Sequence, residues 1–197
     1  MNKKLQIIGL AGTNGSGKDT VGELLASEHG YLFFSVTELL RKECTRRSLP
    51  VERENLRMIS AEWRRELGLG VLIDKAIAEY QIVRDEYTGV VMASLRNPGE
   101  ADRVHEFGGT VVWIDAAPRA RYDRVQANVA TRGRAEEDNK TFEQFLAEEA
   151  TEMHVPAGGD SAMLDSSAVR ERCDVFLTND SSDLSTLEAA LVSALKL

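Results

Sequence analysis

Near its amino terminus the chain has a glycine-rich run with the residue types and spacing of a phosphate-binding loop: Gly12, Thr13, Asn14, Gly15, Ser16, Gly17, Lys18, Asp19 and Thr20. The glycines let the backbone curl until successive N–H groups point at one anion, and a helix that follows adds partial positive charge from its N-terminus. Lys18 is placed to reach the β- and γ-phosphates of a nucleotide, and a hydroxyl should ligate Mg²⁺. The usual hydroxyl position is Asp19 here, with Thr20 next. The loop therefore predicts a nucleotide-phosphate site.

Basic side chains are concentrated in two segments of an acidic chain. The 197 residues include 24 Lys and Arg against 32 Asp and Glu, for a net charge of −8. Residues 41–65 nevertheless hold eight basic side chains against four glutamates, and residues 116–134 hold five arginines against one aspartate. Such segments favour binding of a small, highly charged anion, although Arg and Glu at helical spacing also pair on solvated faces. The overall acidity argues against a protein that coats nucleic acid.

The composition indicates one globular domain, residues 1–197, with a single main core. Hydrophobic residues make up 43% and charged residues 28% of the chain, which argues against disorder. No apolar run approaches the ~18 residues that a membrane span needs, so no membrane partner is expected. Cys44 and Cys173 have no metal-ligand spacing, as in a cytoplasmic protein with reduced thiols. Composition leaves a monomer and a dimer both open.

Short apolar runs alternate with helical patterns along the chain. Near-continuous hydrophobicity predicts five strands buried on both faces, at residues 5–9, 31–35, 90–94, 110–115 and 174–178. Helical patterns lie between them, at residues 19–29, 37–47, 52–66, 71–83 and 98–107, and two more begin with capping-box spacing at Thr141 and Ser185. This alternation predicts a three-layer α/β/α fold with a five-stranded parallel sheet. The glycine-rich loop then connects the first strand to the first helix.

In these motifs the chain resembles the P-loop nucleoside monophosphate kinases. Gly17-Lys18-Asp19-Thr20, with a non-hydroxyl residue before the threonine, is similar to the loop of adenylate-kinase-type enzymes and of phage deoxynucleotide kinases. Residues 34–41 (FSVTELLR) look like the family segment whose arginine, here Arg41, holds the acceptor phosphate. Residues 92–98 (MASLRNP) stand where the family has a second clamp, here Arg96. The resemblance covers essentially the whole chain in order.

Later segments extend the resemblance. Residues 118–124 and 132–134 look like the family's lid entry and lid arginines, and Thr178-Asn179-Asp180 is like a segment of relatives that act on cytidylates or are called dephospho-coenzyme-A-kinase-like. The resemblance implies a P-loop NTPase fold with a helical acceptor-binding insertion at residues 36–86 and a short lid at residues 119–140. The catalytic residues that it implies are Lys18, Arg41, Arg96, Arg124, Arg132 and Arg134.

The activity implied is transfer of the γ-phosphoryl group of ATP·Mg²⁺ to a small phosphorylated acceptor, most readily a (deoxy)nucleoside monophosphate such as CMP or dCMP. Such a transfer needs in-line positioning of two polyanions and neutralisation of the charge on the transferred group. Arginine suits this task because its planar fork binds phosphate through two parallel hydrogen bonds and stays protonated.

One position departs from the family pattern. The family holds magnesium with an aspartate at the position of Ala93, whereas residues 90–94 (VVMAS) contain no acid. The candidate metal ligands are therefore Asp19, Thr20 and Asp115. We favour a kinase with a relocated ligand. Two alternatives remain: a dephospho-coenzyme-A-kinase-like enzyme, although residues 35–37 (SVT) stand where those enzymes have Asp-Ala-Asp, and a nucleotide-binding sensor without transfer activity.

Overall fold

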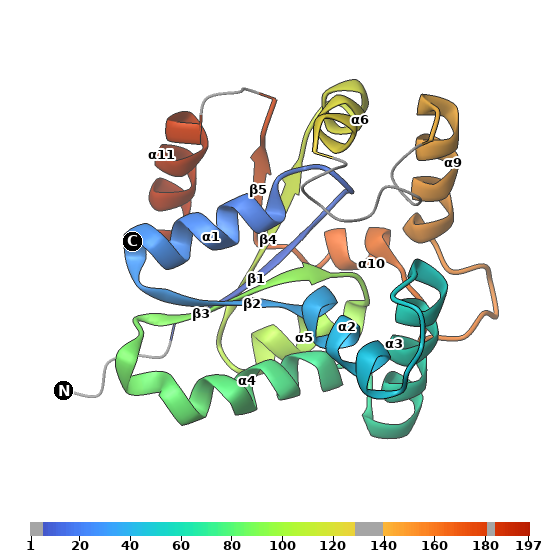
Figure 1. Cartoon of the computed structure of the whole chain (residues 1–197). Helices are drawn as coiled ribbons and strands as arrows, with labels where there is room; N and C mark the ends of the chain where they lie inside the picture. Colours follow the sequence, from blue (N-terminus) through green and yellow to red (C-terminus); the bar gives the residue numbers. More distant parts are fainter. Residues whose placement is uncertain (1–5, 129–139, 181–183) are drawn as a thin grey trace.

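The computed structural model describes residues 6–128, 140–180 and 184–197, and a parallel sheet forms its centre (Figure 1). The sheet has five strands: β1 (Gln6–Gly12), β2 (Tyr31–Ser35), β3 (Gly89–Leu95), β4 (Thr110–Asp115) and β5 (Val175–Thr178). Their order across the sheet is β2-β3-β1-β4-β5, and every neighbouring pair is parallel. All five predicted strands are confirmed, with β1 reaching three residues further into the glycine-rich loop than predicted.

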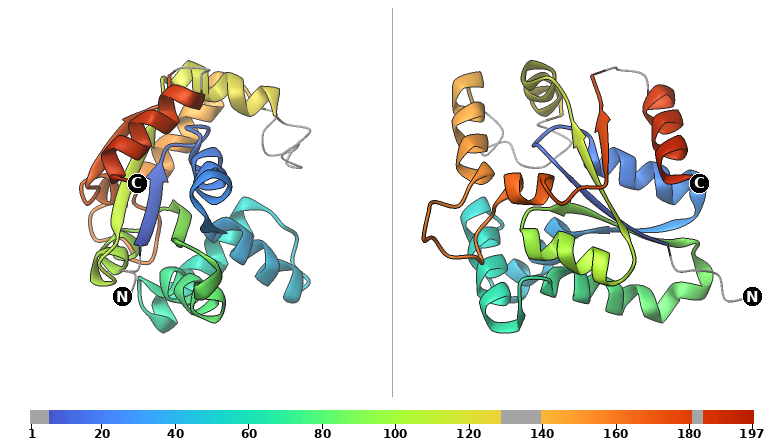
Figure 2. Two further views of the ribbon diagram at one scale, coloured as in Figure 1. Left: turned by 90° about the vertical axis from the view of Figure 1, so that its left-hand side faces the viewer. Right: turned by 180° about the vertical axis from the view of Figure 1, so that it is seen from behind.

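Helices cover both faces of this sheet (Figures 1 and 2). One face packs against α4 (Val71–Val83), α5 (Pro98–Glu106) and α10 (Ser166–Arg170), and the other against α1 (Lys18–His29) and α11 (Leu184–Leu195). Alternate residues of β1 enter the two cores, with Ile7 on one side and Ile8 on the other. Because both faces are buried, the strands read as near-continuous apolar runs. The predicted three-layer α/β/α arrangement is confirmed.

The residues between β2 and β3 form a helical unit with a small core of its own. It consists of α2 (Val36–Arg46), α3 (Arg53–Leu67) and α4, followed by a 3₁₀ turn at Arg84–Glu86. Leu40, Ile59 and Leu72 are buried together where the three helices meet. These helices occupy the range of the predicted acceptor-binding insertion, residues 36–86, whose binding role stays a prediction.

Two further helices follow β4, α6 (Pro118–Ala127) and α9 (Phe142–Met153). Thr141 and Gln144 form the predicted capping box at the start of α9. The predicted cap at Ser185 is wrong, because α11 already begins at Leu184, and α10 has no counterpart among the predicted helices. The predicted lid, residues 119–140, begins within α6 and continues outside the described residues. Among the helices that the structure describes, none is long and apolar enough to cross a membrane.

The carboxyl ends of β1, β3 and β4 meet at one edge of the sheet. β1 continues through the glycine-rich loop into α1 on one face, whereas β3 leads to α5 on the other face. In open α/β sheets, ligands bind in the crevice at the carboxyl edge where successive connections leave to opposite faces. The fold therefore places the glycine-rich loop at the position where such a sheet forms a binding site.

Candidate functional site

The glycine-rich loop has a backbone that only glycine fits at three positions, Gly12, Gly15 and Gly17. Gly12 has φ +140°, and a Cβ there would lie 1.9 Å from the Ile114 carbonyl oxygen. Gly17 has φ +96°, and a Cβ there would lie 2.5 Å from Asn179 Nδ2. The loop therefore curls tightly against β4 and the residue that follows β5, as a cradle of backbone N–H groups for phosphate requires. These residues fit the phosphates of a nucleotide.

Lys18 begins α1 and lies across the loop. Its side chain is buried, and Nζ donates a hydrogen bond to the Thr13 carbonyl oxygen at 2.5 Å and to Ser16 Oγ at 3.4 Å. Burial, together with the positive charge of Arg96, lowers the pKa of Lys18 to about 8. A desolvated cation held over a ring of N–H donors interacts strongly with a phosphate oxygen, because the low local dielectric weakens screening.

A cavity of about 410 Å³ opens above the loop. It brings together predicted site residues from three parts of the chain: Lys18, Asp19, Thr20, Arg96 and Arg124 all line it. Asp19 is exposed at the first turn of α1, next to the half-buried Thr20. Asp19 and Thr20 supply a carboxylate and a hydroxyl at the same cavity, oxygen ligands of the kind that Mg²⁺ takes, so these residues fit the ion.

Two side chains at the carboxyl ends of β4 and β5 hold the loop in place. Thr13 Oγ1 donates a hydrogen bond to Asp115 Oδ1 at 2.7 Å, and Asn179 Nδ2 donates to the Ser16 carbonyl oxygen at 2.8 Å. The backbone N–H of Asn179 also donates to the Asp115 carbonyl oxygen at 2.7 Å. Asp115 does not line the cavity above the loop, so the structure gives its carboxylate a role in orienting Thr13; its role as a metal ligand stays a prediction.

Arg121 is a loop-holding residue that the sequence pattern did not single out. Its guanidinium is buried, donates to the Ala116 carbonyl oxygen at 2.8 Å and to the Asn14 carbonyl oxygen at 3.2 Å, and pairs with Glu149 of α9. The chain pattern shows only that Arg121 belongs to an arginine-rich segment. Which of these arginines turns inward depends on how α6 packs.

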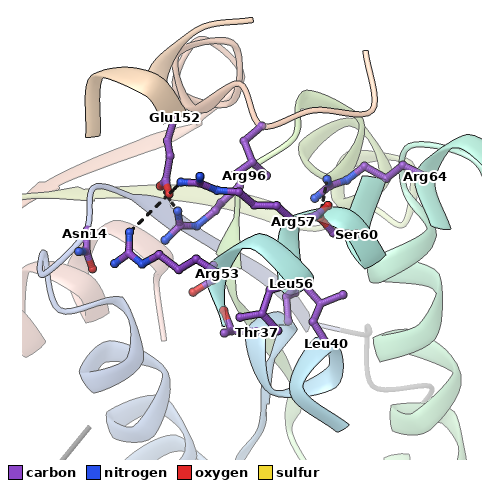
Figure 3. A pocket seen from close by; sticks show the side chains of 13 residues that line it. Asn14, Thr37, Leu40, Arg53, Leu56, Arg57, Ser60, Arg64, Arg96 and Glu152 are labelled. Carbon is purple, nitrogen blue, oxygen red and sulfur yellow. Dashed lines mark hydrogen bonds and ion pairs between the residues drawn. The ribbon is translucent and has the colours of Figure 1, made fainter. Parts of the chain in front are cut away.

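A second, smaller cavity of about 80 Å³ adjoins the first, between the loop, α2 and α3 (Figure 3). Arg53 and Arg57 on α3 and Arg96 after β3 line it, and all three contact the carboxylate of Glu152 on α9. Burial alone would raise the pKa of Glu152, but the charges of Arg96 and Arg57 outweigh burial and hold the pKa below its ordinary value. The cavity is thus an arginine-lined site beside the loop.

This second cavity differs from the predicted acceptor site in its residues. Arg96 lines it as expected, whereas the lining does not include Arg41 on α2. Arg53 and Arg57 take the inward positions instead; their spacing of four residues on one helix face was the signal available in the sequence. The roles of Arg41 and Arg96 as acceptor clamps stay predictions. Arg132 and Arg134 lie outside the described residues.

Arg96 is fixed through its backbone by Glu100, which is fully buried. Glu100 Oε2 accepts hydrogen bonds from the backbone N–H groups of Arg96 and Asn97 at 2.7 and 3.1 Å. Its Oε1 accepts from Arg64 Nη2 at 2.6 Å, and Arg64 Nη1 donates to the Ala162 carbonyl oxygen at 3.0 Å. The network ties α3, α5 and the segment before α10 to the end of β3, so Arg96 leaves the sheet in a fixed direction.

The end of β3 lacks an acid, as the sequence indicated. Ala93 is fully buried, and the register with β1 shifts just after it. Ser94 occupies the shift with φ +76°, a conformation that costs a non-glycine residue about 1–2 kcal/mol. Ser94 lines both cavities. Within the described ranges, no group of three or more His, Cys, Asp and Glu side chains is arranged to hold a metal ion.

Comparison with known proteins agrees with this geometry. Residues 8–148 match the AAA domain family. The chain is 28% identical over 188 residues to a UPF0200 protein of Pyrobaculum aerophilum, with 93% of each chain covered. It is 30% identical over 166 residues to a UPF0200 protein of Hyperthermus butylicus, covering 84% of this chain and 85% of that one. Its fold is similar to that of shikimate kinase from Acinetobacter baumannii in complex with shikimate, with a TM-score of 0.55, 17% identity, and 98% and 95% of the two chains covered.

Proposed function

Because the chain belongs to the AAA domain family and to the UPF0200 family and has a P-loop kinase fold, we propose that it is a kinase that transfers the γ-phosphoryl group of ATP to a small phosphorylated acceptor. The observation that carries this proposal is the junction of the two cavities. The loop cavity and the arginine-lined cavity share Asn14, Thr37, Ser94 and Arg96 as lining residues. Two anions bound in them would face each other across these residues, as transfer between two phosphates requires.

Each side chain of the site has a task in such a transfer. Lys18 exchanges its contact with the Thr13 carbonyl for phosphate oxygens of the nucleotide, and Arg124 faces the same cavity. Arg96 stands at the junction, where a guanidinium neutralises the charge that spreads over the transferred group. Thr20 and Asp19 would hold Mg²⁺, which supplies further charge neutralisation on the β- and γ-phosphates when it is bound.

The acceptor that we propose is a nucleoside monophosphate such as CMP or dCMP, with dephospho-coenzyme A as the alternative. The arginine-lined cavity supports a phosphorylated acceptor, because arginines bind phosphate dianions better than neutral groups. Its apolar wall, which includes Val36, Leu40 and Leu56, offers contact to an uncharged part of the same molecule.

A sensor that binds ATP without transferring phosphate is the second candidate function. The observation in its favour is the end of β3, where Ala93 is buried and residues 90–94 contain no acid. The arginine-lined cavity counts against it, because a protein that only senses ATP has no need for a second anion site next to the first.

The test is ADP formation from ATP and Mg²⁺ with a panel of ribo- and deoxynucleoside monophosphates and dephospho-coenzyme A. Lys18→Ala serves as the blank, and Lys42→Ala, at an exposed position of α2, controls for the loss of a lysine elsewhere. Acceptor-dependent turnover above the blank would support the kinase and identify its acceptor. Binding of ATP without turnover on any acceptor would favour the sensor, and the absence of ATP binding would refute both.

A further inference from the structure

The arginine-lined cavity already contains an anion, the carboxylate of Glu152 (Figure 3). Arg57 Nη2 lies 2.6 Å from Glu152 Oε1, Arg53 Nη1 lies 3.7 Å from the same oxygen, and Arg96 donates to Oε2. The Glu152 side chain is only 11% exposed, so its carboxylate is largely removed from water, whereas Arg57 stays partly exposed. Three guanidinium groups thus converge on one side chain that the chain itself supplies.

In the described part of the chain, two arginines share one carboxylate at this point. Arg53 also pairs with Glu148, at 3.2 Å. Arg57 and Arg96, by contrast, share the single carboxylate of Glu152 among the ion pairs formed by the described residues. If Glu152 served only to attach α9 to α3, one arginine would be enough to pair with it. The extra cation costs repulsion energy in the present arrangement, and a ligand with two negative charges would remove that cost.

The arginines come from α3 and from the residue after β3, whereas Glu152 comes from the last turn of α9. Arg96 is fixed by the buried Glu100, and Arg53 and Arg57 lie on the first two turns of α3. The charges of Arg96 and Glu152 both act on the pKa of Lys18. Arg96 and Glu152 are therefore within electrostatic range of the lysine that faces the nucleotide phosphates.

We propose that Arg53, Arg57 and Arg96 form the subsite for the phosphate monoester of the acceptor, and that Glu152 occupies this subsite until the acceptor displaces it. The proposal rests on the proposed function, since it concerns the acceptor side of the same transfer. A phosphate monoester carries two charges and three terminal oxygens, which match three guanidinium forks better than the two oxygens of a carboxylate do. Glu152 is then an affinity-determining residue, because every acceptor must compete with it.

When Glu152 leaves the subsite, α9 remains attached through Glu149, which pairs with Arg121. Arg121 in turn donates to the Asn14 carbonyl of the P-loop. Displacement of Glu152 therefore breaks one contact of α9, whereas the contact between Glu149 and Arg121, on the nucleotide side, is kept. This arrangement lets the acceptor enter without disrupting the P-loop.

The proposal is tested by phosphate binding in the absence of turnover. Inorganic phosphate at about pH 8 is the probe, measured by calorimetry with ADP present to occupy the P-loop. Glu152→Gln removes the competing charge and is expected to bind phosphate about tenfold or more tightly than the wild type, as the loss of a charged competitor implies. The control is Glu143→Gln, at an exposed position in the first turn of the same helix, which should change the affinity by less than about threefold.

A second variant keeps the test decisive. Arg57 does not line the loop cavity, so its substitution should leave the nucleotide side unchanged. If phosphate binds in the arginine-lined cavity, the double variant Glu152→Gln and Arg57→Gln should lose the gain in affinity that Glu152→Gln gives alone. If Glu152→Gln is too unstable to purify, Arg57→Gln alone should weaken phosphate binding. Unchanged or weaker binding in Glu152→Gln, or an equal gain in Glu143→Gln, would overturn the proposal. Tighter phosphate binding without turnover on any acceptor would keep the subsite and refute the kinase.

Discussion

The buried pair of Glu100 and Arg64 offers the most quantitative test of how the site is held. Glu100 is fully buried and accepts hydrogen bonds from Arg64 and from two backbone N–H groups, those of Arg96 and Asn97. Glu100→Ala would leave the Arg64 guanidinium buried without its carboxylate. Breaking one partner of a buried ion pair costs about 3–5 kcal/mol, and the orphaned N–H groups add to that cost. This is a large part of the stability of a domain of this size.

The assay is equilibrium unfolding in urea, combined with a double-mutant cycle. Arg64→Met alone should also destabilise the protein, but in the Glu100→Ala background it should cost little or even restore stability, since it removes the uncompensated charge. Glu106→Ala on the same helix is the matched control. Glu106 is exposed and pairs with Arg103 at the surface, so its loss should change the free energy of unfolding by less than about 0.5 kcal/mol.

The same variants link the pair to the function. Because Glu100 holds the backbone of Arg96, Glu100→Gln is expected to raise the acceptor KM more than the KM for ATP. A Glu100→Ala variant destabilised by less than about 1 kcal/mol, or additive free energies in the cycle, would refute the assignment of this network as the support of Arg96.

Three further predictions concern single residues. Burial lowers the pKa of Lys18 to about 8, so above that pH Lys18 loses the proton that phosphate binding needs. The Kd for ATP, measured by calorimetry, should therefore rise about tenfold between about pH 7 and pH 9. Lys18→Met should bind ATP weakly at both pH values. Arg96→Ala should raise the acceptor KM about tenfold or more while the KM for ATP changes less, and equal effects on both in steady-state kinetics would contradict the acceptor role. Ser94→Gly should have a free energy of unfolding about 0.5–1 kcal/mol higher than Ser94→Ala, because alanine, unlike glycine, is strained at the φ of +76°. Equal urea midpoints for the two variants would show that this backbone is not strained.

The fold was largely readable from the sequence because its signals are local. A strand buried on both faces needs a continuous apolar run, and a parallel sheet needs a helix between successive strands. The glycines of the P-loop could be assigned for the same reason, since their positive φ values are properties of single residues. The resemblance to P-loop kinases placed Arg96 after the third strand as an acceptor clamp. Arg96 lines the loop cavity, and its role as a clamp stays a prediction.

The remaining features of the site depend on contacts between distant segments. Arg53 and Arg57 line the second cavity, while Arg41 does not, because the small core of α2, α3 and α4 sets which face of each helix turns inward. Glu152 approaches Arg96 across 56 residues of chain, a contact that no local pattern encodes.

The sequence by itself therefore determined the layers, the strand positions and a phosphate-binding loop. Periodicity and glycine chemistry act over a few residues, so a linear reading contains them. The tertiary structure alone decided that Thr13 would engage Asp115, that Ser94 would take the register shift and that a glutamate would fill the arginine-lined cavity. These outcomes follow from sheet register and helix packing, which are fixed only when the whole chain has folded.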